Sequence, residues 1–296
     1  MELRVLRYFL MVAREENITR AANLLHVTQP TLSRQLMQLE EELDTKLFLR
    51  SNHNIILTED GMLLKRRAQE ILSLVERTER DFLREEGQLT GKITIGSGDL
   101  RSTEFLADLI AAFHRAHPLV RYELYSGNAD NIKERIERGL LDIGLLVEPV
   151  DIRRYEFLRS PLKEEYGILV PLDSPLAQRD SITPADLAGQ SLIAANRELV
   201  QNEFAHWYGP GAESLDILIT GNLPYNMAMM ARAGLGLSLG VHLNEDYHGL
   251  RFVPLSPKLE SGSVLAWKKA QTLSPAVSAF LDAAKEYIKG IPEHKM

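Results

Sequence analysis

The chain of 296 residues contains no cysteine. This absence excludes disulfides, thiolate metal sites, cysteine nucleophiles and thiol-based redox sensing. The sequence also has no apolar run as long as a membrane span, and its start, M-E-L-R-V-L-R, lacks the apolar core of a signal peptide. We therefore expect a cytoplasmic protein that does not contact a membrane.

Motifs of the common catalytic sites are also missing. The eight histidines are scattered without the spacing of metal ligands, and the chain has neither a G-x-S-x-G turn nor a P-loop. Gly234 and Gly236 form a lone G-x-G, but it follows a predicted helix instead of a strand and so does not fit a dinucleotide site. We predict that the protein is not an enzyme and holds no cofactor or metal ion.

The chain also lacks an excess of positive charge. The net charge is −7, and residues 1–58 carry as many acidic as basic side chains, which argues against a protein that coats nucleic acid by bulk charge. Acids are, however, absent between Glu16 and Glu40, where the basic residues Arg20 and Arg34 occur. A surface that approaches phosphate cannot carry carboxylates without repulsion, so this acid-free segment is a candidate for contact with DNA.

Residues 17–50 have the pattern of a helix-turn-helix followed by the beginning of a wing. We predict a short helix at residues 19–25, a turn at residues 26–27, and a second helix that Thr28 caps through its hydroxyl. Pro30 is tolerated in the first turn of this helix because no intrahelical donor is lost there. One buried stripe should run along the second helix, formed by Leu32, Leu36, Leu39 and Leu43.

The side chains off this stripe are of the types that meet base edges and phosphates in a major groove. A solvated amphipathic helix is the alternative, but such a face would mix both signs of charge. We assign DNA contacts to the polar face of the second helix, to the helix before it and to the wing. The assigned residues are Arg20, Thr28, Gln29, Pro30, Thr31, Ser33, Arg34, Gln38 and Arg50.

Four motifs follow one another here: L-R-Y-F-L-M-V-A, T-R-A-A-N-L-L-H-V-T-Q-P-T-L-S-R-Q-L, L-E-E-E-L-D-T-K-L-F-L-R and L-T-E-D-G. With them, residues 1–65 resemble the N-terminal domain of the LysR-type transcriptional regulators. The rest of the chain has the length and pattern of that family's effector-binding half. The resemblance implies an α/β protein with an N-terminal winged helix-turn-helix, a long coiled-coil linker helix and a two-lobed effector module of periplasmic-binding-protein type.

Residues 1–58 should form the DNA-binding domain. After the second helix, the chain should form a wing from a strand within residues 44–50, a turn at 51–54 and a strand at 55–57. An amphipathic helix at residues 2–14 should pack beneath the helix-turn-helix. Its predicted stripe consists of Leu3, Leu6, Leu10 and Ala13.

A long helix should begin after Thr58, which can cap it, within a linker at residues 59–90. Its apolar positions step by four and three, which favours a coiled-coil dimerisation seam over a helix lying on its own domain. The stretch 85–91 should end this helix. The predicted seam consists of Leu64, Ala68, Ile71, Val75, Thr78 and Phe82.

From residue 92 short apolar strands alternate with helices, which is the order of a parallel sheet with helices on its faces. Two such sets predict a two-lobed effector domain at 91–296, with lobe I at about 91–161 and 266–296 and lobe II at about 162–265. The resemblance puts the crossings between lobes near residues 158–162 and 265–268. Helices are expected at 103–116, 131–138, 198–208, 223–233 and 275–289; strands are expected at 92–96, 120–125, 141–147, 166–170, 191–194, 216–220, 237–241, 251–254 and 263–267.

Three polar, glycine-containing loops are expected at strand ends, at residues 96–102, 126–128 and 220–224. Ligands of open parallel sheets bind there, because helix N-termini present their N–H groups; ordinary turns and N-caps are the alternative. The resemblance maps effector contacts to Ser97, Ser102 and Asn128, faced from the second lobe by Asn196 and Asn222. Asp99 would suit an amine and Arg101 a carboxylate, so a zwitterion would satisfy both.

These observations predict a sequence-specific DNA-binding transcriptional regulator controlled by a small polar or anionic metabolite bound between two α/β lobes. The expected partners are double-stranded DNA with an interrupted inverted-repeat operator, a second copy of the chain in a dimer or tetramer, and RNA polymerase. A back half that is an enzyme is one alternative, but no convergent nucleophile and base occur. A secreted solute-binding module is the other, and the missing signal peptide opposes it.

Overall fold

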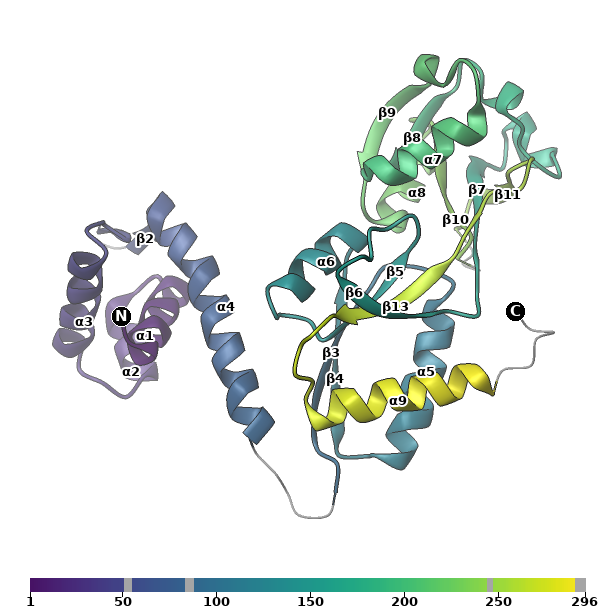
Figure 1. Cartoon of the computed structure of the whole chain (residues 1–296). Helices are drawn as coiled ribbons and strands as arrows, with labels where there is room; N and C mark the ends of the chain where they lie inside the picture. The colour runs from purple at the N-terminus through teal and green to yellow at the C-terminus, as the bar shows by residue number, and fades with distance from the viewer. Residues whose placement is uncertain (51–54, 83–87, 244–246, 291–296) are drawn as a thin grey trace. The chain divides into compact units, whose positions relative to one another are not determined.

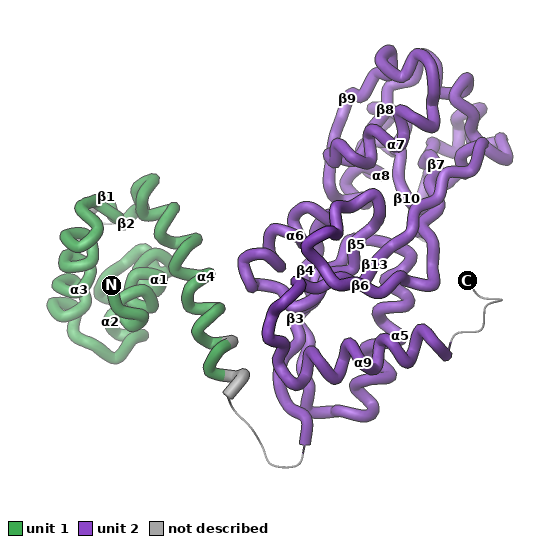
Figure 2. Tube along the Cα trace, viewed as in Figure 1, with its two compact units in different colours: residues 1–83 green, residues 84–296 purple. Residues whose placement is uncertain are grey.

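A computed structural model describes residues 1–50, 55–82, 88–243 and 247–290, without the side chains of Arg50, Arg77, Arg80, Asp81 and Phe82. The predicted turn at 51–54 and residues 85–87 of the stretch 85–91 lie outside these residues. The chain divides into two compact units, residues 1–83 and 84–296 (Figures 1 and 2). None of the helices within the described ranges combines the length and the apolar character needed to cross a bilayer.

The N-terminal unit is a winged helix-turn-helix. Its elements are α1 (Leu3–Glu15), α2 (Ile18–Leu24), α3 (Gln29–Glu42), β1 (Phe48–Arg50), β2 (Ile55–Leu57) and α4 (Glu59–Phe82). Asn17 caps α2 by accepting the N–H of Arg20 at 2.9 Å, and Thr28 caps α3 by accepting the N–H of Thr31 at 3.4 Å. The strands β1 and β2 pair in antiparallel orientation, which confirms the predicted wing hairpin.

Two predicted stripes differ from the structure. The buried side chains of α1 are Val5, Leu6, Phe9 and Val12. Of the predicted stripe, Leu6 is confirmed, Leu10 and Ala13 are only half-buried against the core, and Leu3 is 42% exposed. Leu32, Leu36 and Leu39 are buried as predicted, but Leu43 is 39% exposed. Leu43 is the C-cap of α3, and the chain leaves the helix at Asp44 with φ 48°, so helical spacing no longer applies there.

The helix α4 belongs to the N-terminal unit because its first half packs against α1. Thr58 caps it by accepting the N–H of Gly61 at 2.9 Å, and Glu59 and Asp60 lie in its positive first turn. Ala68 and Leu72 are buried in the core of the unit, and Leu64 and Ile71 pack against that core. The predicted linker helix is therefore partly a structural element of the DNA-binding unit.

Lobe I of the second unit contains a five-stranded sheet in the order β4-β3-β5-β13-β6. Its strands are β3 (Gly91–Ser97), β4 (Val120–Ser126), β5 (Ile143–Val147), β6 (Tyr155–Arg159) and β13 (Ser263–Lys268). The helices α5 (Thr103–Ala116) and α9 (Pro275–Lys289) share one core with the sheet, whereas α6 (Ala129–Glu137) covers the other face. The close approach of α6 requires Gly96 and Gly144, where a Cβ atom would collide with Ile132.

Lobe II contains a second sheet in the order β11-β7-β10-β8-β9, with β12 paired to β7. Its strands are β7 (Glu164–Pro171), β8 (Ser191–Ala195), β9 (Asp216–Gly221), β10 (Leu237–Val241), β11 (Leu250–Pro254) and β12 (Glu260–Ser261). The helix α7 (Glu198–Tyr208) packs on one face and α8 (Pro224–Arg232) on the other. Short 3-10 helices occur at Pro175–Gln178, Pro184–Leu187 and Ala212–Ser214.

Both sheets are mixed, which corrects the expectation of parallel sheets. In lobe I, β13 runs antiparallel to β5 and β6; in lobe II, β7 runs antiparallel to β10 and β11. The chain crosses to lobe II between β6 and β7, as predicted. It returns between β12 and β13, so residues 263–265 belong to lobe I and the predicted second crossing near 265–268 is too late.

Candidate DNA-binding surface and effector cleft

The helix α3 presents a polar face to solvent. Its buried side is fixed by Leu32, Leu36 and Leu39, and this fixes which side chains remain outside. The predicted residues Thr28, Gln29, Pro30, Thr31, Arg34 and Gln38 are all exposed. Among the described residues, Arg34 makes no ion pair, so its guanidinium is available to a base edge or a phosphate.

Three other predicted DNA contacts differ in their surroundings. Ser33 is half-buried, and its hydroxyl accepts a hydrogen bond from the side-chain amide of Gln29 at 3.1 Å. Arg20 is exposed, but its Nε lies 2.8 Å from a carboxylate oxygen of Glu15, which neutralises part of its charge. The side chain of Arg50 lies outside the description, although its backbone belongs to β1. Arg34 is therefore the clearest of the predicted cationic contacts.

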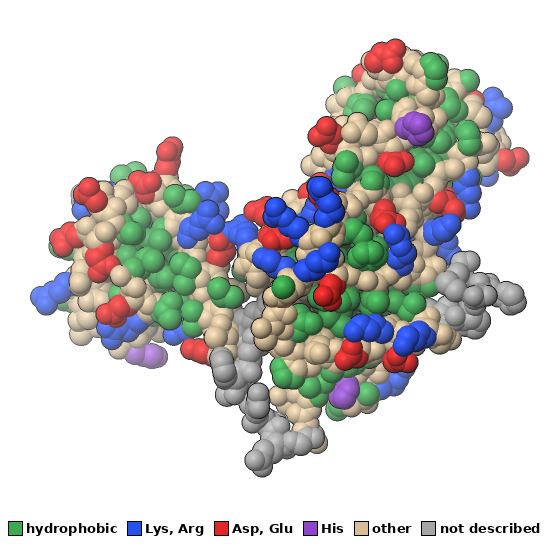
Figure 3. Space-filling model, in the orientation of Figure 1, with side chains coloured by type: hydrophobic (Ala, Val, Ile, Leu, Met, Phe, Trp, Pro, Cys, Tyr) green, Lys and Arg blue, Asp and Glu red, His purple; other side chains and the backbone are tan. Residues whose placement is uncertain are grey.

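The face drawn in Figure 3 shows acidic and basic side chains interspersed on both units. This mixture agrees with the net charge of −7. Binding to DNA would therefore depend on the local arrangement around α3 and not on a large cationic surface.

A cleft lies between the two lobes of the second unit. Its polar walls come from four strand-to-helix loops: β3–α5 with Asp99, β4–α6 with Asn128, β8–α7 with Asn196 and β9–α8 with Asn222. These loops lie where parallel strands end and helices begin, as expected of ligand sites in α/β sheets. The structure brings these four predicted residues together around one cleft.

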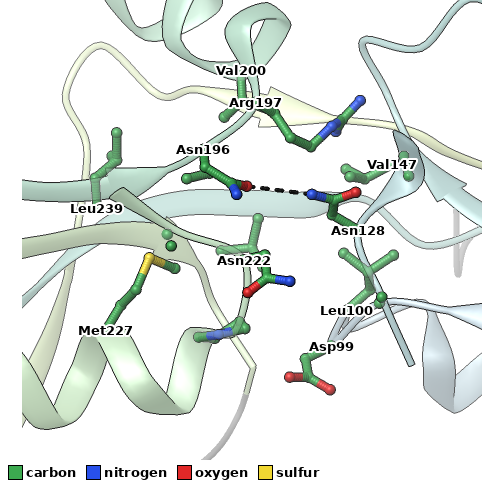
Figure 4. A pocket seen from close by; sticks show the side chains of 18 of the residues that line it. Asp99, Leu100, Asn128, Val147, Asn196, Arg197, Val200, Asn222, Met227 and Leu239 are labelled. Carbon is green, nitrogen blue, oxygen red and sulfur yellow. Dashed lines mark hydrogen bonds between the residues drawn. The ribbon is translucent and has the colours of Figure 1, made fainter. Parts of the chain in front are cut away.

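A hydrogen bond between two asparagine side chains crosses this cleft (Figure 4). The side-chain amide of Asn128 donates to the side-chain carbonyl of Asn196 at 3.3 Å, joining lobe I to lobe II. The carbonyl of Asn128 also accepts the N–H of Asn131 at 2.9 Å and so caps α6. The orientation of Asn128 is therefore fixed by its own helix.

The remaining walls are largely apolar. Val147 and Leu100 come from lobe I, and Val200, Met227 and Leu239 come from lobe II. Tyr166 also lines the cleft, and burial raises the pKa of its hydroxyl, so this ring stays neutral at physiological pH. Such a cleft suits a small ligand with an apolar body and a few hydrogen-bonding groups.

Three predicted effector contacts do not line this cleft. Ser97 donates its hydroxyl to the carbonyl of Gly98 at 2.9 Å and borders a neighbouring hollow. Ser102 is fully buried at the start of α5. Arg101 is exposed and helps to lower the pKa of Glu260, an effect led by the hydrogen bond from Lys258. Arg101, the residue expected to bind the carboxylate of a zwitterionic ligand, is therefore not part of the cleft.

The reason lies in an internal carboxylate. Glu164, the first residue of β7, is fully buried and accepts the backbone N–H groups of Arg101 at 2.8 Å and Ser102 at 3.0 Å. These are the groups expected to receive an anionic effector at the start of α5. Because Glu164 occupies them, no anion is needed from outside at this helix.

Arg197 was not predicted but lines the cleft. Its side chain is 4% exposed, and it holds Asp130 at 3.2 Å from Nε and the carbonyl of Pro149 at 3.0 Å from Nη2. The Nη1 group is buried and has no partner among the described residues. The available signal in the sequence was its place directly after Asn196, at a strand end. Its bonds to Asp130 and Pro149 join lobe II to lobe I.

The predicted dimerisation seam needs one correction. Ala68 is 0% exposed inside the N-terminal unit, so it cannot contact a partner helix and its assignment is wrong. Leu64, Ile71 and Val75 are half-buried, and Thr78 is exposed. The side chain of Phe82 lies outside the description. Exposed apolar side chains of α4 occur instead at Met62, Leu63 and Leu74.

Comparison with known proteins agrees with this architecture. The family description "Bacterial regulatory helix-turn-helix protein, lysR family" matches residues 3–62, and "LysR substrate binding domain" matches residues 86–289. The Hca operon transcriptional activator HcaR of Escherichia coli (strain K12) is 30% identical, covering 98% of this chain and 99% of its own. The uncharacterized HTH-type transcriptional regulator YybE of Bacillus subtilis (strain 168) is 30% identical, covering 97% and 98%.

Solved structures share the fold. Full-length CbnR complexed with its target DNA matches with a TM-score of 0.74 at 22% identity, covering 97% of this chain and 99% of CbnR. The chain belongs to the LysR family of transcriptional regulators. It is a DNA-binding transcriptional regulator that combines a helix-turn-helix domain with a two-lobed effector-binding domain.

Proposed function

We propose that α3 enters the major groove of an operator and that its exposed polar face reads base edges. The observation that carries this proposal is Arg34, an exposed cation without an ion-pair partner among the described residues, on a stretch of α3 that has no carboxylate before Glu40. Thr28, Gln29, Thr31 and Gln38 supply neutral hydrogen-bonding groups beside it. Arg20, Pro30, Ser33 and Arg50 remain proposed contacts with bases or backbone.

The test uses a duplex selected by the full-length protein from a random-sequence pool. Arg34→Ala should weaken binding by about 1–3 kcal/mol and relax selectivity at one base position, because a bidentate contact with a base would be lost. Glu41→Ala, an exposed change on the same helix, is the control and should leave affinity unchanged or slightly higher. Wild-type affinity and selectivity in Arg34→Ala would rule out this reading of α3.

We also propose that the cleft between the lobes binds the effector through Asn128, Asn196 and Asn222, with Asp99 at its rim. The apolar walls favour a small molecule with an apolar body. The buried Nη1 of Arg197 offers a donor to an anionic group, whereas Asp99 offers an acceptor to an amine. The ligand is therefore polar at its ends and apolar between them.

A thermal-shift screen of metabolites against the full-length protein tests this proposal. Asn222→Leu should abolish the stabilisation by any hit, because it removes a hydrogen-bonding group at an exposed wall position. Asn226→Leu changes an exposed asparagine of α8 that lies outside the cleft lining, and this control should keep the stabilisation. Equal stabilisation in both variants would mean that the hit binds elsewhere.

We propose that the active species is a dimer or tetramer that binds an interrupted inverted repeat, with the outer part of α4, including Val75 and Thr78, in contact with a second copy. The apolar side chains exposed on α4 support this arrangement. Acting on genomic DNA, the protein would work in the cytoplasm, where it can meet RNA polymerase. Its role would be regulatory and not catalytic, in keeping with relatives that are transcriptional regulators.

A further inference from the structure

Glu40 is a buried acid on the recognition helix. It is the first acid after the acid-free segment and is 3% exposed, although carboxylates are rarely buried without a compensating partner. Its position on α3 places it on the side opposite the exposed polar face, next to the buried residue Leu39. A charge in this place requires a specific role, because a leucine would fill the core without a desolvation penalty.

The partners of Glu40 lie at the start of the wing. Its Oε1 accepts the backbone N–H of Leu47 at 2.8 Å and that of Phe48 at 3.3 Å, and its Oε2 lies 3.3 Å from Nζ of Lys46. Leu47 and Phe48 are both buried, so these two N–H groups cannot turn to water. These hydrogen bonds therefore offset the free-energy cost of burying the Glu40 carboxylate and the cost of burying two consecutive backbone N–H groups.

The same segment is attached to α4 as well. The hydroxyl of Thr58 donates to the carbonyl of Lys46 at 2.6 Å, and the N–H of Thr58 donates to the carbonyl of Leu47 at 3.0 Å. The carbonyl groups of residues 46 and 47 are thus held by α4, and the N–H groups of Leu47 and Phe48 by α3. This segment is clamped between the two helices immediately before β1.

We infer that Glu40 is a positioning residue that fixes the wing relative to the recognition helix, so that both elements meet one DNA surface together. This inference rests on the proposed function of α3 and the wing in DNA binding. The carboxylate of Glu40 is buried, so it does not repel phosphate. An acidic residue at this position is therefore compatible with a helix that binds DNA. Loss of the carboxylate frees the wing without changing any side chain on the exposed face of α3.

The experiment compares Glu40→Ala and Glu40→Gln with the matched control Glu41→Ala, using the duplex selected by the wild-type protein. Glu40→Ala should bind roughly tenfold more weakly, and the slope of log K against log salt should shrink by about 1, because wing contacts with phosphate are lost. Base selectivity conferred by α3 should be retained. Glu40→Gln keeps an oxygen acceptor for both N–H groups and should restore most of the affinity and the slope.

A purely structural role would lower the melting temperature of Glu40→Ala but leave the affinity and salt slope of the folded protein at their wild-type values, and this result would overturn the inference. Amide exchange in the wild-type protein provides a second measurement that does not depend on folding of the variant. Leu47 and Phe48 should exchange as slowly as the core amides of α3; fast exchange would overturn the inference. Arg34→Ala, measured on the same duplex, separates the two proposals because its loss of selectivity tests α3 alone.

Discussion

Ala68 and Val75 were both expected on one dimerisation seam, but the structure makes opposite predictions for them. Ala68 is 0% exposed in the core of the N-terminal unit, whereas Val75 lies further along α4, beside the exposed Leu74. Ala68→Asp would introduce a carboxyl group into that core. Val75→Asp would introduce it on the surface proposed to contact a second copy.

The loss of stability expected for Ala68→Asp follows from the protonation state of the introduced carboxyl group. A buried carboxyl group without a partner stays neutral, and keeping it neutral at pH 7 costs about 1.4 kcal/mol for each of the roughly three pH units above its ordinary pKa, or about 4 kcal/mol. This is a large fraction of the stability of a small domain, which is about 5–15 kcal/mol in total. Because only the unfolded state ionises, the penalty should shrink as the pH falls from 7 towards 4.

Circular dichroism and light scattering at dilute concentration separate the two variants. Ala68→Asp should lose helical signal of the N-terminal unit at pH 7 and regain part of it at lower pH. Val75→Asp should keep the helical signal but dissociate into monomers, because an unpaired charge is costly in an interface. Ser73→Asp, at an exposed position of α4, is the control. A folded but monomeric Ala68→Asp variant would refute the packing of α4 against α1.

Two further predictions concern the effector domain. Glu164→Leu should lower the thermal stability of this domain by at least about 2 kcal/mol, because it leaves the N–H groups of Arg101 and Ser102 buried without an acceptor; an unchanged melting curve would contradict the bonding described. Ser97→Ala and Arg101→Gln should leave ligand stabilisation as in the wild type, since neither side chain lines the cleft. A lost thermal shift in either variant would extend the site beyond the cleft.

The regular elements of the chain were largely predictable from the sequence. The helices α5, α7 and α9 and the strand β10 have the predicted bounds, because each combines a clear apolar period with a cap or a glycine at its end. The strand β6 was missed because Tyr155–Arg159 is short and mostly exposed, at the edge of its sheet. An edge strand buries too few side chains to leave a strong pattern.

The face that a helix buries was harder to predict than the helix itself. Apolar residues surround more than half of α1, so that Leu3, Leu6 and Leu10 formed one acceptable stripe and Val5, Phe9 and Val12 another. Only the positions of the neighbouring helices select between them. The same limit explains Ala68: spacing by four and three shows that a helix packs on something, but not whether that partner is α1 or a second copy.

The effector cleft shows the same division between local and distant information. Sequence located the strand ends, and three asparagines at those ends do surround one cleft. It could not show that the N–H groups at the start of α5 are already bound by Glu164, which is sixty-two residues from Ser102 in the chain. A helix N-terminus is an anion site only while its donors are free. Because Glu164 already binds the N–H groups at the start of α5, we expect a ligand to contact the asparagine side chains, Asp99 and Arg197 instead. The spacing of these residues in the sequence does not distinguish them from ordinary turn residues.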